Sequence, residues 1–217
     1  MAVSRRAVLK RRPARPRLSR DEKARRTHDA ILTAAQRVVA ADGYAAASIA
    51  RMAEEAGVAQ GTFYNYFEDR QALFDQLLPH EGLRMRAWVE RASHTTGPGM
   101  EREFARFEAF LDYVSEHEGF YRILVEAEVF APQAHRAHMD NIVQGYTRSF
   151  RRAMTEGRAL VLDDLQLTCL IHQLLGMRAY AAMQIHHAAS KTERAQIKQA
   201  ATQMYRLLLS ESLLRPD

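Results

Sequence analysis

The chain has 217 residues, which allows one large domain or two small ones, and its formal net charge is +5. Hydrophobic residues make up 47% of it, so a substantial core can form, and the absence of alternating apolar runs favours an all-α fold. The single cysteine, Cys169, excludes an internal disulfide, and no apolar run reaches the roughly 18 residues of a membrane span. We therefore expect a soluble, cytoplasmic protein that does not enter membranes.

Basic residues are concentrated at the N-terminus. Residues 1–26 hold eleven of the 31 Lys and Arg but two of the 26 Asp and Glu, a net charge of +9 that leaves −4 for the rest of the chain. We expect residues 1–20 to be a disordered basic arm that contacts nucleic-acid phosphates, although a solvated tail would have the same composition. Pro13 and Pro16 argue against an amphipathic targeting helix in this segment.

Two short helices joined by a tight turn are predicted after a first helix that begins between Asp21 and Arg25 and ends before Gly43. The first of the pair carries an apolar stripe with helical spacing, and Gly57 ends it because a glycine adopts the left-handed conformation there without strain. The second helix is predicted from Gln60 to Phe67. Two helices joined in this way form a helix-turn-helix. The stripe consists of Ile49, Met52, Ala53 and Ala56.

The outward face of the second helix is polar but uncharged. Phe63 and Phe67 are four residues apart, so both should point inward. Small and hydrogen-bonding side chains on the opposite face suit a helix that enters the DNA major groove and contacts base edges. The alternative is a tyrosine-rich core helix with both rings half buried. The predicted DNA-reading residues are Gln60, Gly61, Thr62, Tyr64, Asn65 and Tyr66.

The residues between about 25 and 75 match a known pattern at fixed spacing and without a gap. The matching motifs are I-L-x-A-A at 31–35, G-Y at 43–44, M-A-x-x-A-G-V at 52–58 and G-T-x-Y-x-Y-F at 61–67, followed by Arg70 and Leu73. This segment resembles the DNA-binding half of the TetR/AcrR family of bacterial repressors. The resemblance covers about a third of the chain and says little about the remainder, which in this family is a divergent helical domain for ligand binding and dimerisation.

The resemblance implies a homodimer that binds a palindromic operator in double-stranded DNA, with Ser48 and Arg70 on phosphates. Three positions depart from the family pattern, which often has Thr at Ala47, Ser at Ala59 and Lys at Arg70. Ala59 would be the N-cap of the recognition helix, and losing a capping side chain typically costs about 1 kcal/mol. We expect Gln60 or a bound phosphate to compensate.

The rest of the chain is predicted to be helical throughout, which gives three regions: the arm 1–20, the helix-turn-helix domain 21–68 and an effector-binding and dimerisation domain 69–217. Pro79 should kink or break the helix that begins near Asp69. Cys169 lies in an apolar run and is expected to be buried. The later helices are predicted at about 101–117, 120–130, 132–155, 164–189 and 192–214, the fourth of them capped by Asp163 or Asp164.

An effector site and a dimer interface are both expected in this last region. The two C-terminal helices carry long apolar stripes that can pair with a second copy as a four-helix bundle, or bury each other within one chain. Polar residues in an otherwise apolar helix suggest a pocket for an apolar ligand with one polar or acidic end, which Arg178 could serve. The predicted pocket residues are Phe107, Tyr121, His172, Gln173, Met177 and Tyr180.

Catalytic and metal-binding patterns do not emerge from the sequence. The nine histidines do not form a zinc-binding pattern, and nucleophile and phosphate-loop motifs are missing, so we expect neither a cofactor nor an enzyme. The function predicted from the sequence is a DNA-binding transcriptional regulator, a repressor that a small apolar ligand releases from its operator. The alternatives are a regulator without an effector and a helical enzyme with a vestigial DNA-binding module.

Overall fold

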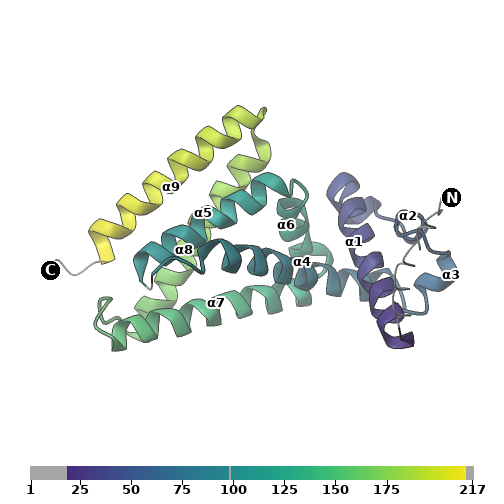
Figure 1. Cartoon of the computed structure of the whole chain (residues 1–217), viewed down its shortest axis with the longest axis horizontal. Coiled ribbons are helices and arrows are strands. Elements are labelled where there is room, and N and C mark those ends of the chain that lie inside the picture. The colour runs from purple at the N-terminus through teal and green to yellow at the C-terminus, as the bar shows by residue number, and fades with distance from the viewer. Residues whose placement is uncertain (1–18, 98, 214–217) are drawn as a thin grey trace, which may run out of the picture.

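The computed structural model describes residues 19–97 and 99–213, and the side chains up to residue 209. This part of the chain is all-helical, as expected, and forms an elongated body with a small domain at one end (Figure 1). The predicted arm lies outside the described residues except for its last two positions. The helices are α1 (Arg20–Ala46), α2 (Ile49–Glu55), α3 (Gln60–Phe63), α4 (Arg70–Ser93), α5 (Met100–Glu116), α6 (Phe120–Phe130), α7 (Pro132–Thr155), α8 (Asp164–His187) and α9 (Lys191–Leu213).

Helix α1 begins at Arg20, one residue before the earlier of the two predicted starts. Ser19 caps α1: its hydroxyl accepts the backbone N–H of Glu22, and the Glu22 carboxylate accepts the backbone N–H of Ser19. This reciprocal arrangement satisfies two orphan donors at the helix start. Gly43, with φ of +81°, interrupts α1 where the sequence placed its end, and one further turn follows.

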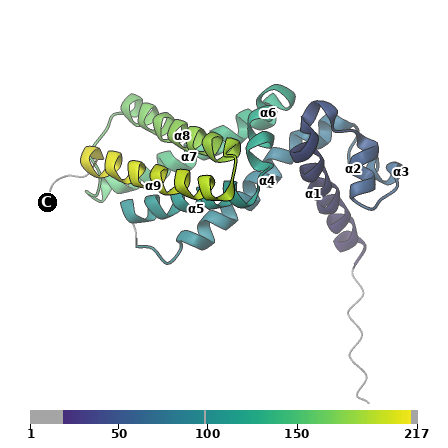
Figure 2. The same cartoon turned by 90° about the horizontal axis from the view of Figure 1, so that it is seen from above.

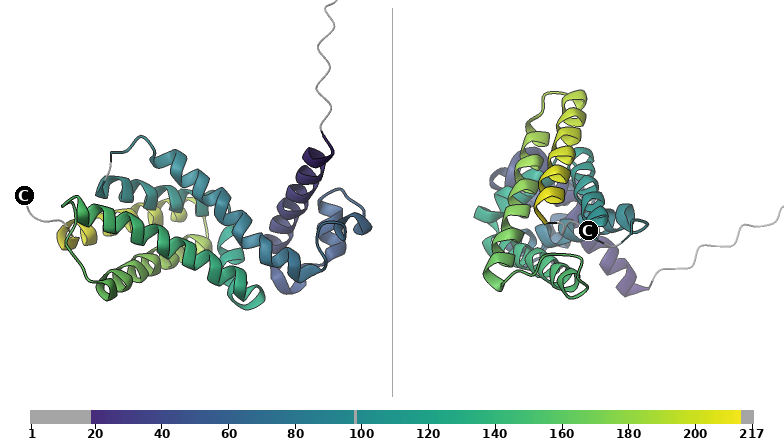
Figure 3. Two further views of the ribbon diagram at one scale, coloured as in Figure 1. Left: turned by 90° about the horizontal axis from the view of Figure 1, so that it is seen from below. Right: turned by 90° about the vertical axis from the view of Figure 1, so that its left-hand side faces the viewer.

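Helix α4 connects the small domain to the larger helical body (Figure 3). Its first half, including Phe74 and Leu77, belongs to the core of the small domain, and its second half, including Trp88, packs on the core of the body. The expectation that Pro79 breaks this helix was wrong, because α4 continues through it. A proline inside a helix costs about 3 kcal/mol, and burial of α4 in both cores offsets that cost.

The larger body is formed by α5 to α9 and the second half of α4. Helix α5 packs against α4, α8 and α9, while α7 packs against α4 and α8. Helices α8 and α9 run side by side at the far side from the small domain (Figure 2). None of the described helices combines the length and apolar character needed to cross a membrane.

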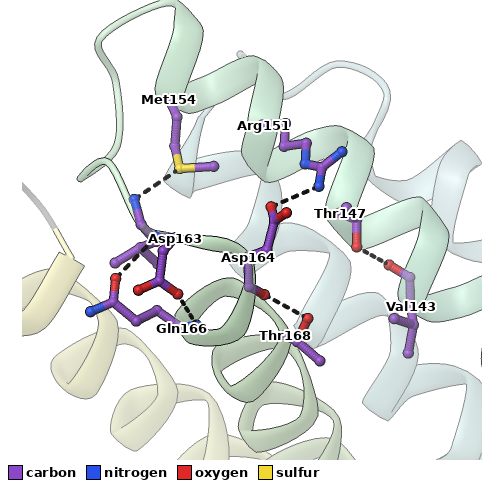
Figure 4. A network of polar contacts seen from close by, with 9 residues as sticks. Val143, Thr147, Arg151, Met154, Asp163, Asp164, Gln166 and Thr168 are labelled. Carbon is purple, nitrogen blue, oxygen red and sulfur yellow. Dashed lines mark hydrogen bonds and ion pairs between the residues drawn. The ribbon is translucent and has the colours of Figure 1, made fainter.

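The junction between α7 and α8 is fixed by local polar contacts (Figure 4). Asp163 caps α8 by accepting the backbone N–H of Gln166, and the Gln166 side chain accepts the backbone N–H of Asp163. Arg151 of α7 forms an ion pair with Asp164 at 2.9 Å. These contacts confirm the predicted helix start. They also help to fix the rotation of α8 about its own axis.

Helix α6 also contacts the small domain, at the end of α1. Arg122 donates to the backbone carbonyls of Ala40 and Ala41 at 3.1 and 2.8 Å, and Glu126 accepts the backbone N–H of Tyr44 at 2.8 Å. These contacts satisfy polar groups at the end of α1 that lack partners within the helix. The small domain is thus anchored to the body through both α4 and α6.

Candidate nucleic-acid interface

The turn between α2 and α3 has the geometry that the sequence predicted. Gly57 adopts φ of +68°, and Val58 packs against the core beneath the turn. The regular part of α3 is shorter than predicted and ends at Phe63. The backbone N–H of Asn65 bonds to the third residue before it, Thr62, so the segment continues as a tight turn to Phe67.

Two phenylalanines anchor α3 from below. Phe63 and Phe67 are fully buried, with ring centroids 5.4 Å apart, and the His28 ring of α1 stacks on Phe67 at 4.9 Å. Burying such rings stabilises the packing by a few kcal/mol each. The opposite face of α3 therefore has a fixed orientation toward solvent.

The residues predicted to read DNA divide into two groups by exposure. Gln60, Gly61, Tyr64 and Asn65 are exposed, whereas Thr62 and Tyr66 are half buried. The Tyr64 ring lies edge-on against Phe63 with centroids 5.6 Å apart, which fixes its base while half of the side chain remains accessible. The structure thus presents a polar, uncharged face, centred on Tyr64.

The two residues predicted to contact phosphates both flank this face. The Ser48 hydroxyl caps α2 by accepting the N–H of Arg51 at 3.3 Å, which leaves its own O–H able to donate. Arg70 donates weakly to the carbonyls of Ala45 and Ala47 at 3.4 and 3.3 Å, so it also holds the loop between α1 and α2. Both side chains are exposed, and their contact with phosphate stays a prediction.

The N-cap of α3 is vacant, as the sequence predicted. Ala59 adopts the extended conformation of an N-cap residue but contributes no side-chain hydrogen bond. The free N–H groups at the start of α3 are therefore available to an anion such as a DNA phosphate.

A family model described as "Bacterial regulatory proteins, tetR family" matches residues 31–77, which run from α1 into α4 and include the whole helix-turn-helix. Over these residues the chain is similar to the DNA-binding region of the TetR family.

The relatives that match this chain are transcription regulators. The HTH-type transcriptional activator FasR of Mycolicibacterium smegmatis is 31% identical over 54% of the chain and 52% of its own length. The HTH-type transcriptional repressor KstR of the same organism is 27% identical over 65% of the chain and 73% of its own length. The chain thus aligns with about half of FasR. The solved structure of TylP, a TetR regulator from Streptomyces fradiae, is 24% identical, covers 90% of both chains with a TM-score of 0.71, and shares the fold.

The six residues predicted to line an effector pocket do not all come together. His172, Gln173 and Tyr180 lie on the outward face of α8, and the His172 ring bonds to the Thr168 carbonyl of its own helix at 2.8 Å. Cys169 is exposed as well, contrary to expectation. The apolar residues of α8 are too evenly distributed to fix its phase, so the sequence could not show which face is buried.

The other three predicted pocket residues all belong to or pack against the core of the body, each with different neighbours. The Phe107 ring stacks on Tyr205 of α9 at 3.9 Å, whereas the Tyr121 ring lies beside His186 at 4.9 Å. Met177 is half buried against the core of the body. Of the predicted set, Phe107 and Met177 remain candidates for an interior site.

The sequence analysis missed a polar cluster in the interior of the body. Arg178 of α8 is only 8% exposed, and it forms an ion pair with Glu103 of α5 at 2.6 Å. Tyr146 of α7 and Tyr205 of α9 donate to the same carboxylate at 3.1 and 2.7 Å. Burial, with the Glu103 charge adding to it, raises the pKa of the Tyr205 hydroxyl, which therefore remains a donor. The sequence analysis named Arg178 but had no signal that it is buried, because the apolar residues of α8 do not define one face.

Proposed function

We propose that this chain is a homodimeric, sequence-specific DNA-binding regulator of transcription, a repressor that a small ligand releases from a palindromic operator. The observation that carries the proposal is the outward face of α3, which is polar and uncharged and is held over two buried phenylalanines. The names of the relatives support regulation, and they include both an activator and a repressor.

The exposed residues of α3 have the chemistry to read base edges. Amide and hydroxyl groups of Gln60, Asn65 and Tyr64 can donate to and accept from bases in the major groove. Thr62 and Tyr66 contribute at the edges of the contact, and Gly61 allows close approach of the backbone. Arg70 lies close to Ser48, because it bonds to the carbonyl of Ala47. Ser48 and Arg70 bind phosphates beside α3 and fix the register without reading sequence.

The effector binds the state that cannot bind DNA more tightly, because a ligand with equal affinity for both states does not shift the equilibrium between them. Helices α4 and α6 both hold the small domain, so a rearrangement in the body that moves either helix changes the position of α3. The revised candidate region for the ligand is the interior around Phe107 and Met177, with an apolar ligand as its occupant.

The proposal is tested by selecting DNA fragments from a random pool with the purified chain and footprinting the selected site. We expect a protected pseudo-palindrome. Tyr64→Ala should weaken binding to this site by about 1–3 kcal/mol, the value of one good base contact, without a change in thermal stability. Tyr64→Phe separates the hydroxyl from the ring, and Val129→Ala, at an exposed position on α6, is the control. A chain that selects no sequence would favour the helical-enzyme alternative.

A further inference from the structure

The guanidinium of Arg178 is an unusual charge to find inside a helical body. The rings of Phe107, Phe110, Tyr146 and Tyr205 surround it at 5.3–5.8 Å from its central carbon. Removing an arginine from water is costly unless its N–H groups find acceptors. Yet one terminal nitrogen bonds to Glu103, and the buried Nε–H has no acceptor among the described residues.

The cluster also has more hydrogen-bond donors than acceptor atoms. Arg178, Tyr146 and Tyr205 all donate to one oxygen, Oε1 of Glu103. The three donors come from α8, α7 and α9, and they converge on a single point. This is the arrangement of a carboxylate receptor, in which charge-assisted donors meet at an anion.

Glu103 differs from the donors in its place in the fold. It lies in the first turn of α5, after Gly99, which adopts φ of +96°. The donors, in contrast, lie in the interiors of long helices. The carboxylate is therefore the component that can leave, since a helix end opens at a lower cost than a helix interior.

We propose that Arg178, Tyr146 and Tyr205 form the binding site for the carboxylate of an apolar organic acid, and that Glu103 occupies this site in its absence. The entering carboxylate replaces the Glu103 carboxylate one for one, so the buried charge stays balanced. It can bond to Nε–H and the terminal nitrogen together, which Glu103 does not do. The apolar part of the acid lies among the rings of Phe107 and Phe110.

This exchange has a direct route to the DNA-binding domain. Displacement of Glu103 frees the first turn of α5, and α5 packs along α4, whose other half lies in the core of the small domain. The inference deepens the proposed function, because it names the class of the releasing ligand. Acid binding can be measured without DNA, so the proposed acid site and the proposed DNA-binding function can be refuted independently.

The test is calorimetric titration of the full chain with octanoate, decanoate and 4-phenylbutyrate, each compared with its methyl ester. We expect at least one acid to bind and its ester to bind at least about tenfold more weakly, the value of losing a charge-assisted hydrogen bond. Glu103→Gln weakens the internal competitor and should tighten acid binding severalfold. Arg178→Met should abolish the preference for the acid over the ester.

Matched variants separate recognition from folding. Arg106 on the same helix as Glu103 forms a surface ion pair with Glu90 at 3.2 Å, so Arg106→Met is the control and should bind the acid like the wild type. If Arg178→Met does not fold, Tyr205→Phe removes one donor and should weaken the acid but not the ester. Equal binding of acid and ester, no binding of any acid to wild type and Glu103→Gln, or an unchanged affinity in Glu103→Gln would overturn the proposal. If an acid binds but the affinity for the operator stays unchanged, the acid site is supported and the release of DNA by this ligand is refuted.

Discussion

His138 of α7 is a buried histidine whose neutral form the fold requires. Its ring packs directly on Gly82 of α4, where even a Cβ atom would overlap with it. Burial, with the nearby His135 and Arg86 adding to it, lowers the pKa of His138 to about 4. The unfolded chain binds this proton near pH 6.5 and the folded chain only near pH 4, so the histidine favours folding above 6.5 and that contribution is lost as the pH falls toward 4.

We expect the free energy of unfolding to decrease by up to about 3 kcal/mol between pH 6.5 and 4 because of this one residue. Urea unfolding of the wild type and of His138→Gln over this range measures it. The variant should lose stability at pH 7 but show a flatter dependence on pH. If the free energy of unfolding depends on pH in the same way in both proteins, other groups cause the acid sensitivity.

Single residues were predicted best where their partners are close in sequence. Phe63, Phe67, Gly57 and the vacant cap at Ala59 all follow from spacing within one or two turns. The interior cluster could not be found in this way, because Glu103 and Arg178 are 75 positions apart and meet only when α5 packs on α8. Polar residues in an apolar helix are a valid signal, but the sequence does not tell which of them point inward.

Helix α6 approaches α1 so closely that its N-cap position must be glycine. A Cβ atom at Gly119 would overlap with the Cβ of Ala40, which belongs to the helix that α6 holds through Arg122. Gly119→Ala should therefore destabilise the chain by about 1–3 kcal/mol, the usual cost of overpacking. The matched control is Gly145→Ala, in the middle of α7 with no atom within 4 Å of the added Cβ, and it should stabilise by up to about 1 kcal/mol. Thermal unfolding of both variants gives the comparison, and equal effects would contradict the close packing.

Whole helices were predicted more reliably than their interruptions. Caps, glycines and apolar spacing gave the ends of α5 to α8 to within about two residues of the structure. The failures at Pro79 and at the end of α3 have a common cause, because in both places tertiary packing decides whether a helix continues. Pro79 lies between the two cores in which α4 is buried, and the helix continues through it. Helix α3 ends at Phe63, whose side chain is buried.

The molecule as a whole has an apolar surface on α8 and α9 that a single chain leaves in water. Large apolar side chains remain exposed along these two neighbouring helices, with Leu165 at 73% and Tyr180 at 69%. Exposed apolar patches of this kind mark interfaces, and a stable one buries about 1,600 Å² in total. The outward position of His172 and Gln173, which excludes them from an interior pocket, places them beside this surface. The surface also includes Met204, Leu207 and Leu208, each about half exposed.

This surface predicts a two-fold dimer in which α8 and α9 of two chains form a four-helix bundle. Leu208→Glu would place a carboxylate in the interface, and we expect it to give monomers in sedimentation at micromolar concentration while the helical content stays unchanged. The control is Val129→Glu, at a 74% exposed position on α6 outside this surface, which should remain dimeric. Because a dimer reads two half-sites about 10 base pairs apart, or a multiple of that spacing, the Leu208→Glu monomer should also lose the footprint on both half-sites at concentrations at which the wild type protects them. A wild-type chain that sediments as a monomer would contradict the interface, and a monomeric Val129→Glu would move it to α6.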